Sequence, residues 1–256
     1  MAAAEGCVID LDGTLYFAGE PIPGAAEAVD RLRSAGVPIC FATNTTRRPR
    51  SALVERLAAM GIIVRPDELH TAPVAAASWL AGRGAGRVSL LLAEATFEEF
   101  GDFQVDHQLP DHVVVGDLGD AWTFEILNRA FRALNAGAQL VAIQKNRSWD
   151  AGNGLQLDAG PFVAALEYAS GQEAVLVGKP STAFFETAAA ALGLSLDRVA
   201  VVGDGVATDV AGGQAAGCRG VALRTGTFRE DQLVDLERPP DAILDSIAGL
   251  PDWIGV

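Results

Sequence analysis

Apolar and polar residues alternate along the chain in blocks that predict short buried strands separated by amphipathic helices. An apolar run ends at Asp10, and residues 25–35 then carry apolar side chains at helical spacing. Residues 37–42 form a second apolar run, typical of a buried strand, and residues 50–60 repeat the helical pattern. Strands and helices that alternate in this order indicate a parallel α/β sheet.

The same alternation continues through the rest of the chain. Strands are predicted at 88–92, 113–116, 140–143, 174–177, 199–202 and 219–223, with an edge strand at 241–244. Helices are predicted at 123–135, 161–170, 183–192 and 210–216. The middle block either continues the first sheet or forms a second α/β unit inserted into it. Periodicity alone leaves both arrangements open.

Composition narrows the class of protein and of partner. Of the 256 residues, 50% are apolar and 20% are charged, which indicates a globular protein with one large core or two modest ones. Lys plus Arg number 19 against 33 Asp plus Glu, a formal net charge of -14. Such a surface repels phosphate backbones, so we expect no nucleic-acid or membrane partner. An anionic substrate would then need a metal ion or a suitably placed lysine.

The cysteines indicate the compartment. Cys7, Cys40 and Cys218 lie far apart in sequence, without a Cys-x-x-Cys pair, and two of them fall in apolar strands. This pattern is typical of buried free thiols in a reducing compartment. No stretch approaches the roughly 18 uncharged apolar residues of a membrane span. We therefore expect a cytoplasmic protein.

Polar side chains close several of the predicted strands. Asp10 ends the first strand and begins the sequence Asp-x-Asp-Gly-Thr, while Thr43, Lys179 and Asp204 each follow a different strand. If these strands share one parallel sheet, the side chains gather at the edge where ligands bind. Alone, Asp-Gly is ordinary turn chemistry, Lys179 a solvated lysine and Thr43 a strand-end hydroxyl. Only their joint placement indicates a site.

Converging carboxylates without enough basic partners favour a bound cation. Asp10, Asp204, a backbone carbonyl near Asp12 and waters would suit Mg²⁺, which prefers oxygen ligands. Asp209 could cap the following helix or support the metal site; the two interpretations are compatible, and both stay open. A zinc site has little support, because the histidines occur in unrelated surroundings and are expected at the surface. They are His70, His107 and His112.

A metal ion, a lysine and a threonine hydroxyl around an acidic edge indicate a phosphate site. Positioning and electrostatic stabilisation are most of what phosphoryl transfer requires. An aspartate can also serve as the nucleophile, which gives an aspartyl-phosphate intermediate. Asp10 would then attack phosphorus, and Asp12 would protonate the leaving oxygen and later activate water.

The segments that carry these residues, in this order, resemble the haloacid dehalogenase-like phosphohydrolase superfamily. Residues 10–14 match its first motif, 43–44 the second, 179–180 the third and 203–209 the fourth. The long insertion between the second and third motifs resembles the C2-type cap of subclass IIA. Within that subclass the chain is similar to the phospholysine phosphohistidine inorganic pyrophosphate phosphatase group.

The resemblance implies an α/β fold with a Rossmann-like parallel-sheet core, at 1–75 and 176–256, and an inserted smaller α/β cap domain at 76–175. It implies a Mg²⁺-dependent phosphatase that hydrolyses small phosphomonoesters, or pyrophosphate or phospho-amino acids, through an aspartyl-phosphate intermediate. It also makes a homodimer through the cap plausible.

The resemblance also assigns residue roles. Asp10 is the implied nucleophile and Asp12 the general acid and base. Thr43, Asn44 and Lys179 are implied to bind the phosphoryl group. The implied metal-binding residues are Asp10, Asp12 through its carbonyl, Asp204 and, in the outer shell, Asp209.

Two non-enzymatic interpretations compete with this one. Receiver-type signalling modules also place an acceptor aspartate, a second acid, a threonine and a lysine around Mg²⁺ on a parallel sheet. The long insertion between Thr43 and Lys179 speaks against such a module, as does the acid two residues after Asp10. A phosphate-binding protein without catalysis is the other alternative. Every residue that the chemistry requires is present, which favours the enzyme.

Overall fold

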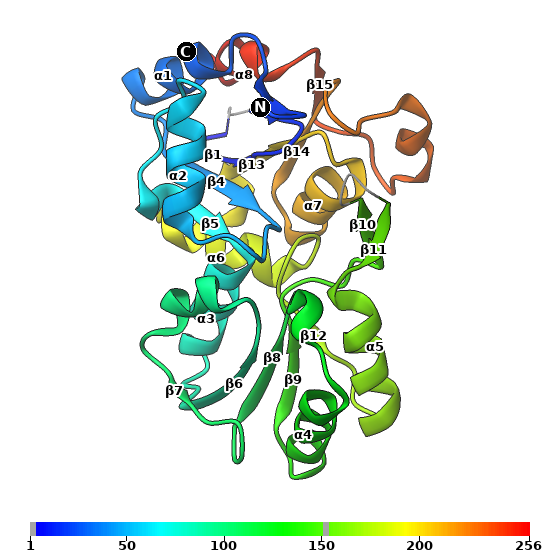
Figure 1. Cartoon of the computed structure of the whole chain (residues 1–256). Coiled ribbons are helices and arrows are strands. Elements are labelled where there is room, and N and C mark those ends of the chain that lie inside the picture. The colour runs from blue at the N-terminus through cyan, green and yellow to red at the C-terminus, as the bar shows by residue number, and fades with distance from the viewer. Residues whose placement is uncertain (1–3, 151–153) are drawn as a thin grey trace. The chain divides into compact units, whose positions relative to one another are not determined.

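The computed structural model describes residues 4–150 and 154–256, and the chain divides into two compact units (Figure 1). The first unit contains the chain up to Thr43, Arg50–His70 and Lys179–Val256. The second contains Asn44–Pro49 and Thr71–Gly178. Each unit has its own parallel sheet, so the middle block is a second α/β unit and does not continue the first sheet.

The sheet of the first unit has the strand order β15-β14-β13-β1-β4-β5. The central strand β1 pairs in parallel with β13 and β4, and Ile9 lies opposite Val202 on one side and Phe41 on the other. All five residues of β1 are buried, as expected for a strand covered on both faces. The strands are β1 (Gly6–Asp10), β4 (Ile39–Thr43), β5 (Leu69–Thr71), β13 (Val199–Gly203), β14 (Arg219–Leu223) and β15 (Ala242–Leu244).

Helices pack on both faces of this sheet because successive side chains of a strand point to opposite faces. Cys7 and Ile9 belong to a core shared with α1, α2 and α8. On the other face α7 approaches closely, since a Cβ at Gly213 would lie 2.7 Å from the side chain of Val201. The helices are α1 (Ala25–Ser34), α2 (Arg50–Ala59), α6 (Thr182–Leu192), α7 (Gly212–Ala216) and α8 (Leu250–Ile254).

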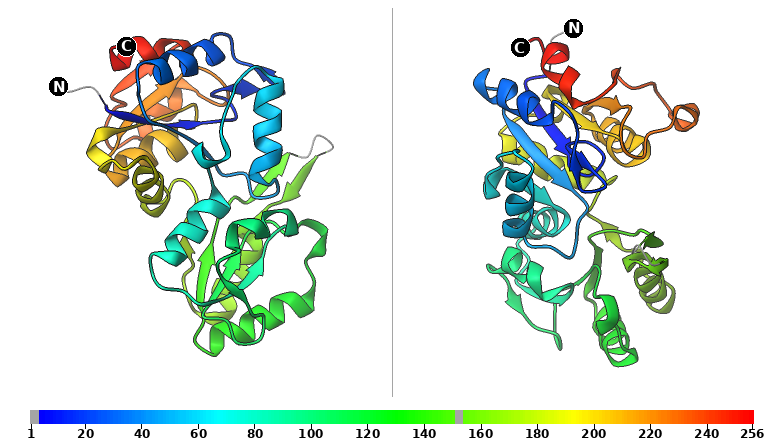
Figure 2. Two further views of the ribbon diagram at one scale, coloured as in Figure 1. Left: turned by 90° about the vertical axis from the view of Figure 1, so that its left-hand side faces the viewer. Right: turned by 45° about the horizontal axis from the view of Figure 1, so that its top comes forward.

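In the first unit, helix α8 packs against helix α1. Both views in Figure 2 show α8 beside α1. Arg31 of α1 donates hydrogen bonds to the Asp252 carboxylate and to the Val256 carbonyl, each at 2.6 Å. Leu250 and Ile254 of α8 are buried in the shared core. Packing of these apolar side chains therefore fixes the end of the chain to the sheet that carries Asp10.

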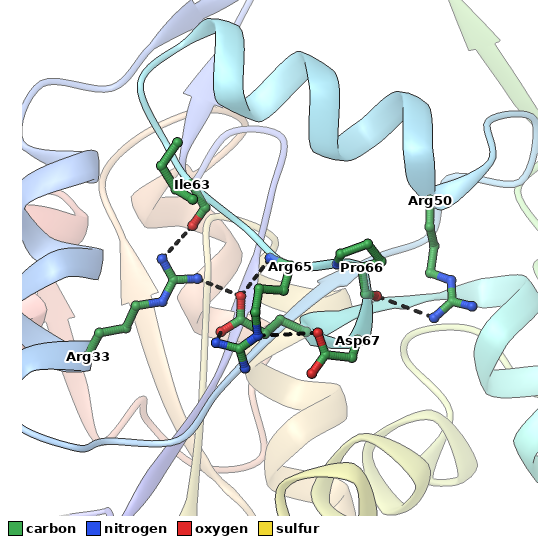
Figure 3. A network of polar contacts seen from close by, with 7 residues as sticks. Arg33, Arg50, Ile63, Arg65, Pro66 and Asp67 are labelled. Carbon is green, nitrogen blue, oxygen red and sulfur yellow. Dashed lines mark hydrogen bonds and ion pairs between the residues drawn. The ribbon is translucent and has the colours of Figure 1, made fainter.

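The turn before β5 is fixed by arginines from two helices (Figure 3). Arg33 of α1 donates to Glu68 at 2.5 Å, and the backbone N–H of Arg65 donates to the same carboxylate at 2.8 Å. Arg50 of α2 donates to the carbonyl of Pro66 at 3.3 Å. Glu68 is buried, so the bonds from Arg33 and Arg65 satisfy a charge that would be costly alone. They hold the chain where it enters β5.

The second unit is a smaller α/β layer with the strand order β12-β9-β8-β6-β7. Thr123 caps α4 by accepting a hydrogen bond from the Ile126 N–H, and Asp158 caps α5. Val163 of α5 and Leu134 of α4 pack on this sheet in one apolar cluster. The elements are α3 (Ala72–Ala81), β6 (Arg87–Leu91), β7 (Gln104–Val105), β8 (His112–Val115), α4 (Phe124–Asn135), β9 (Gln139–Ala142), α5 (Ala159–Ser170) and β12 (Val175–Leu176), with a hairpin of β10 (Ser148–Asp150) and β11 (Leu155–Leu157).

Two predicted elements differ in detail from the structure. The strand predicted at 174–177 is β12, which pairs with β9 of the second unit and so does not lie in the sheet of β1. The helix predicted at 210–216 is preceded by a π-helical turn at Val206–Ala211, and only Gly212–Ala216 is α-helical. The remaining predicted strands and helices occur within a few residues of their expected bounds.

Candidate active site

An acidic cluster lies at the carboxyl end of the central strands of the first unit. Asp10 is the last residue of β1, and Asp204 directly follows β13. Asp209 comes from the π-helical turn after β13. One carboxylate oxygen from each lies within 4.8 Å of the others, and all three residues are buried. The neighbouring parallel strands therefore bring Asp10 and Asp204 together, as the sequence predicted.

Lys179 is the cation of this cluster. Its Nζ donates to Asp10 Oδ1 at 2.5 Å and to Asp209 Oδ1 at 2.7 Å. The residue is 6% exposed, so its charge is stabilised by these carboxylates and not by water. The condition that all these strands share one sheet does not hold for the strand before Lys179, because β12 belongs to the second unit. The lysine instead begins the segment Lys179–Val256 of the first unit.

Asp209 does not cap a helix. Its backbone N–H donates to the Gly205 carbonyl at 2.8 Å, within the π-helical turn. Neither the π-helical turn nor α7 has a side-chain cap among the described hydrogen bonds. The carboxylate bonds Lys179 instead, and Thr208 Oγ1 donates to its other oxygen at 3.3 Å. Of the two interpretations of Asp209, the structure favours a place in the acidic cluster.

Burial and charge together set the protonation of the cluster. Burial raises the pKa of Asp10 to about 7, against the opposing effect of the Lys179 ammonium, and the Asp209 carboxylate adds to the rise. Burial acts to lower the pKa of Lys179, but the carboxylates of Asp10 and Asp209 outweigh it and raise that pKa. The lysine therefore stays charged. The cluster still carries more acidic than basic groups, which favours a second cation.

The residues fit a hard divalent ion. Three buried carboxylates offer oxygens within 4.8 Å of one another, and Mg²⁺ binds through one or a few carboxylates while it keeps several waters. A site made only of carboxylate oxygens gives no reason to expect zinc, which prefers nitrogen and sulfur ligands.

Asp12 and Thr43 flank the cluster. Asp12 is exposed, and its backbone forms an isolated β-bridge with Tyr16. Although the residue as a whole is exposed, partial burial of its carboxyl raises the pKa of Asp12, and the Arg56 guanidinium opposes the rise. Thr43 is buried and is the last residue of β4, beside β1. Asn44 falls in the second unit, and its phosphate-binding role stays a prediction.

The expectation that the histidines lie at the surface is wrong for His70. Its side chain is 3% exposed, and its Nε2 lies 2.9 Å from Thr187 Oγ1. The ring meets Phe184 edge-on at 5.0 Å between centroids. Burial lowers the pKa of His70 to about 4, so the imidazole is neutral. His107 and His112 are half-buried in the second unit.

Sequence reasoning gave no role to the loop after β14. Thr225 Oγ1 donates to the Gly13 carbonyl at 2.5 Å. Thr227 donates twice to the Asp204 carboxylate. Small polar residues directly after a core strand were the signal that could have pointed to this loop.

Comparison with known proteins places this arrangement among hydrolases. A family model described as haloacid dehalogenase-like hydrolase matches residues 7–104, and a second, HAD-hydrolase-like model matches residues 176–250. The chain is 37% identical over 252 residues to human haloacid dehalogenase-like hydrolase domain-containing protein 2, covering 98% of this chain and 96% of that protein. It is 34% identical over 260 residues to human phospholysine phosphohistidine inorganic pyrophosphate phosphatase, covering 99% and 95%.

A solved structure matches the whole fold. The glycerol phosphate phosphatase of Mycobacterium tuberculosis, in complex with magnesium, superposes with a TM-score of 0.85 at 29% identity, covering 97% of this chain and 76% of that chain. The predicted fold class, a Rossmann-like parallel-sheet core with an inserted smaller C2-type cap, is confirmed.

Fold and site together define a capped α/β phosphohydrolase. The chain belongs to the haloacid dehalogenase-like hydrolase family, as its sequence motifs predicted. Among the described residues, none of the helices has the length and apolar character needed to cross a membrane.

Proposed function

We propose that this phosphohydrolase is a Mg²⁺-dependent phosphatase that hydrolyses small phosphomonoesters through an aspartyl-phosphate intermediate. The observation that carries the proposal is the buried cluster in which Lys179 bridges Asp10 and Asp209 while Asp204 lies close by. A carboxylate nucleophile needs nearby cations to approach a phosphoryl group, and this cluster supplies one and has ligands for another.

The first half-reaction transfers the phosphoryl group to the protein. A carboxylate oxygen of Asp10 attacks phosphorus, and the bond from phosphorus to the leaving oxygen breaks. Asp12 donates its proton to that oxygen, which leaves as an alcohol. The raised pKa of Asp12 supports this role, because a carboxyl that keeps its proton more readily is a better general acid near neutral pH.

The second half-reaction returns the protein to its starting state. Asp12, now ionised, removes a proton from water, and the oxygen of that water attacks phosphorus. The bond between phosphorus and Asp10 breaks, inorganic phosphate leaves, and the Asp10 carboxylate is restored. Asp12 ends with the proton that the next turnover requires.

The remaining residues bind and orient the phosphoryl group. Thr43 offers a hydroxyl at the end of β4, Lys179 offers an ammonium, and Asn44 offers a side-chain amide. Mg²⁺, held by Asp10, the Asp12 carbonyl and Asp204 with Asp209 in support, would neutralise phosphoryl oxygens when bound.

The substrate and the assembly are part of the same proposal. Phosphomonoesters, pyrophosphate and phospho-amino acids all carry the group that the cluster would bind. A homodimer through the second unit is the assembly that we propose, and light scattering after size-exclusion chromatography tests it. The three cysteines are free and buried, which suits the reducing environment of the cytoplasm, where we place the protein.

Phosphate release from a panel of compounds tests the function. The purified protein is incubated with Mg²⁺ and phosphomonoesters, pyrophosphate, phospholysine or phosphohistidine. Asp10→Asn and a chelator should each abolish release from every compound that the wild type hydrolyses. Asp158→Asn is the matched control, since Asp158 is a buried aspartate that caps α5 in the second unit. It should retain activity.

The outcomes separate the three interpretations of the sequence. Release by Asp10→Asn at the wild-type rate would contradict the nucleophile. Release that persists in the chelator would contradict the metal dependence. Long-lived phosphorylation of Asp10 without turnover would favour a receiver-like module, and Mg²⁺-dependent binding without product would favour a phosphate-binding protein.

A further inference from the structure

One oxygen of the Asp204 carboxylate is held by a single residue of the loop after β14. The backbone N–H of Thr227 donates to Asp204 Oδ2 at 2.6 Å, and Thr227 Oγ1 donates to the same oxygen at 2.8 Å. Asp204 is 3% exposed, whereas Thr227 is exposed. Two donors on one oxygen fix the rotation of the carboxylate about its own axis.

The backbone around this carboxylate leaves little room for it to move. Gly13 has φ +86° and Gly226 has φ +56°, and a Cβ on either residue would collide with the Asp204 carboxylate. The two glycines also approach one another closely. Thr225 Oγ1 joins their segments by donating to the Gly13 carbonyl at 2.5 Å. The loop after β14 therefore encloses Asp204 against the loop after β1.

We infer that Thr227 is a positioning residue that orients Asp204 as a metal ligand. With Oδ2 occupied by two hydrogen bonds, Oδ1 is the oxygen that remains for the cation. One oxygen per carboxylate suits Mg²⁺, which demands near-ideal octahedral geometry. The inference rests on the proposed function for the identity of the metal.

Thr225 acts in the same way on the other loop. Thr225 binds the carbonyl of Gly13. Gly13 directly follows Asp12, and the Asp12 carbonyl is the proposed backbone ligand. The peptide that contains the Asp12 carbonyl is held as well, because its Gly13 N–H donates to the Tyr16 carbonyl at 2.7 Å. Thr225 and Thr227 thus tie a carboxylate ligand and a backbone ligand to one short loop, so that both keep their orientation before the metal binds.

Metal binding by Thr227 variants tests the inference. Thr227→Val removes the hydroxyl at nearly constant shape, while Thr227→Ser keeps it. Isothermal titration with MgCl₂, without substrate, gives the affinity of each protein directly. Partners that orient a metal ligand typically contribute 10- to 100-fold to affinity, so we expect Thr227→Val to bind Mg²⁺ about 10-fold more weakly. Thr227→Ser should bind close to wild type.

Thr96→Val is the matched control. Thr96 is buried in the second unit and its hydroxyl donates to the Ala93 carbonyl at 2.8 Å, so the variant loses a hydroxyl bond away from the metal. It should keep wild-type Mg²⁺ affinity. Circular dichroism of each variant confirms the fold, and the exposure of Thr227 makes its substitution mild.

Two failures are distinguishable. If the wild type binds Mg²⁺ and Thr227→Val binds it equally well, the positioning role is wrong and the proposed function stands. The same conclusion follows if Thr227→Ser binds as weakly as Thr227→Val, because the hydroxyl is then not the cause. If the wild type binds no Mg²⁺ at all, both the positioning role and the metal dependence of the proposed function are overturned.

Discussion

Lys179 and Asp10 form a buried ion pair, with 2.5 Å between Nζ and Oδ1, although the 168 residues 11–178 separate them in sequence. The same ammonium lies 2.7 Å from Asp209. One lysine thus compensates two carboxylates that water does not reach. Removing one partner of a buried pair leaves an uncompensated charge, which costs more than the pair itself contributes.

Lys179→Gln should therefore destabilise the protein as well as inactivate it. Without Mg²⁺, two buried carboxylates would face each other without their cation, and we expect a loss of about 3–5 kcal/mol in the free energy of unfolding. Urea unfolding at pH 7.5 with a chelator measures it. Added Mg²⁺ should recover part of the loss, because a ligand that binds only the folded state stabilises it.

The other lysine of the chain provides the control. Lys145 pairs with Glu167 at 2.8 Å, but its side chain is 34% exposed, so water screens the pair. Lys145→Gln should cost no more than about 1 kcal/mol. Equal losses in the two variants would contradict the view that burial of the cluster makes Lys179 important.

Asp12→Asn should separate the two half-reactions. Its side chain is exposed beside the buried cluster, so the substitution leaves the Asp10–Lys179 pair in place. With a substrate whose leaving group needs no proton, Asp10 should still become phosphorylated, and hydrolysis should slow by about 10²- to 10⁴-fold. Mass spectrometry after acid quenching would detect the trapped phosphoprotein. Parallel loss of labelling and turnover would argue against a general acid and base at Asp12.

Much of the fold and of the site was predictable because buried parallel strands have nearly uninterrupted apolar sequences. The runs before Asp10 and Asp204 gave β1 and β13, and their adjacency in the sheet brings the two carboxylates together. A polar residue that interrupts such a run is conspicuous in sequence. The order of the motifs then allowed the family to be named.

Other features depend on tertiary contacts, which the periodicity of apolar residues does not predict. Helix α3 was not predicted because it is buried on most sides and has no polar face. The pairing of β12 with β9 is set by tertiary packing, so the sequence could not tell which sheet contains the strand before Lys179. The bonds from Thr227 to Asp204 join residues 23 positions apart in a loop without a motif.

Gly13→Ala should weaken both stability and metal binding. At φ +86° an alanine is strained, and its Cβ would also collide with the Asp204 carboxylate. Gly19→Ala is the control, because Gly19 has φ +89° and no atom within 4 Å of the added Cβ. Both variants should lose about 1 kcal/mol from backbone strain. Only Gly13→Ala should lose more in urea unfolding and bind Mg²⁺ less tightly; matching behaviour of the two would contradict the collision.

His70 should make the protein sensitive to mild acid. Its pKa is lowered to about 4 in the folded state, chiefly by burial and secondarily by the Arg50 guanidinium, against about 6.5 when unfolded. The folded state therefore binds this proton less readily, so the contribution is complete above pH 6.5 and is lost as pH falls toward 4. We expect about 2 kcal/mol less stability at pH 5 than at pH 7.5 from this residue.

His70→Gln isolates that contribution from the many carboxylates that also titrate. Glutamine cannot titrate but can still share a hydrogen bond with Thr187, which lies 2.9 Å from His70 Nε2. The variant is expected to be less stable than wild type at pH 7.5, since the edge contact with Phe184 is lost. The difference between the two proteins should shrink as the pH of urea unfolding is lowered to 5. A difference that stays constant would show that burial does not lower the pKa of the imidazole in the folded state.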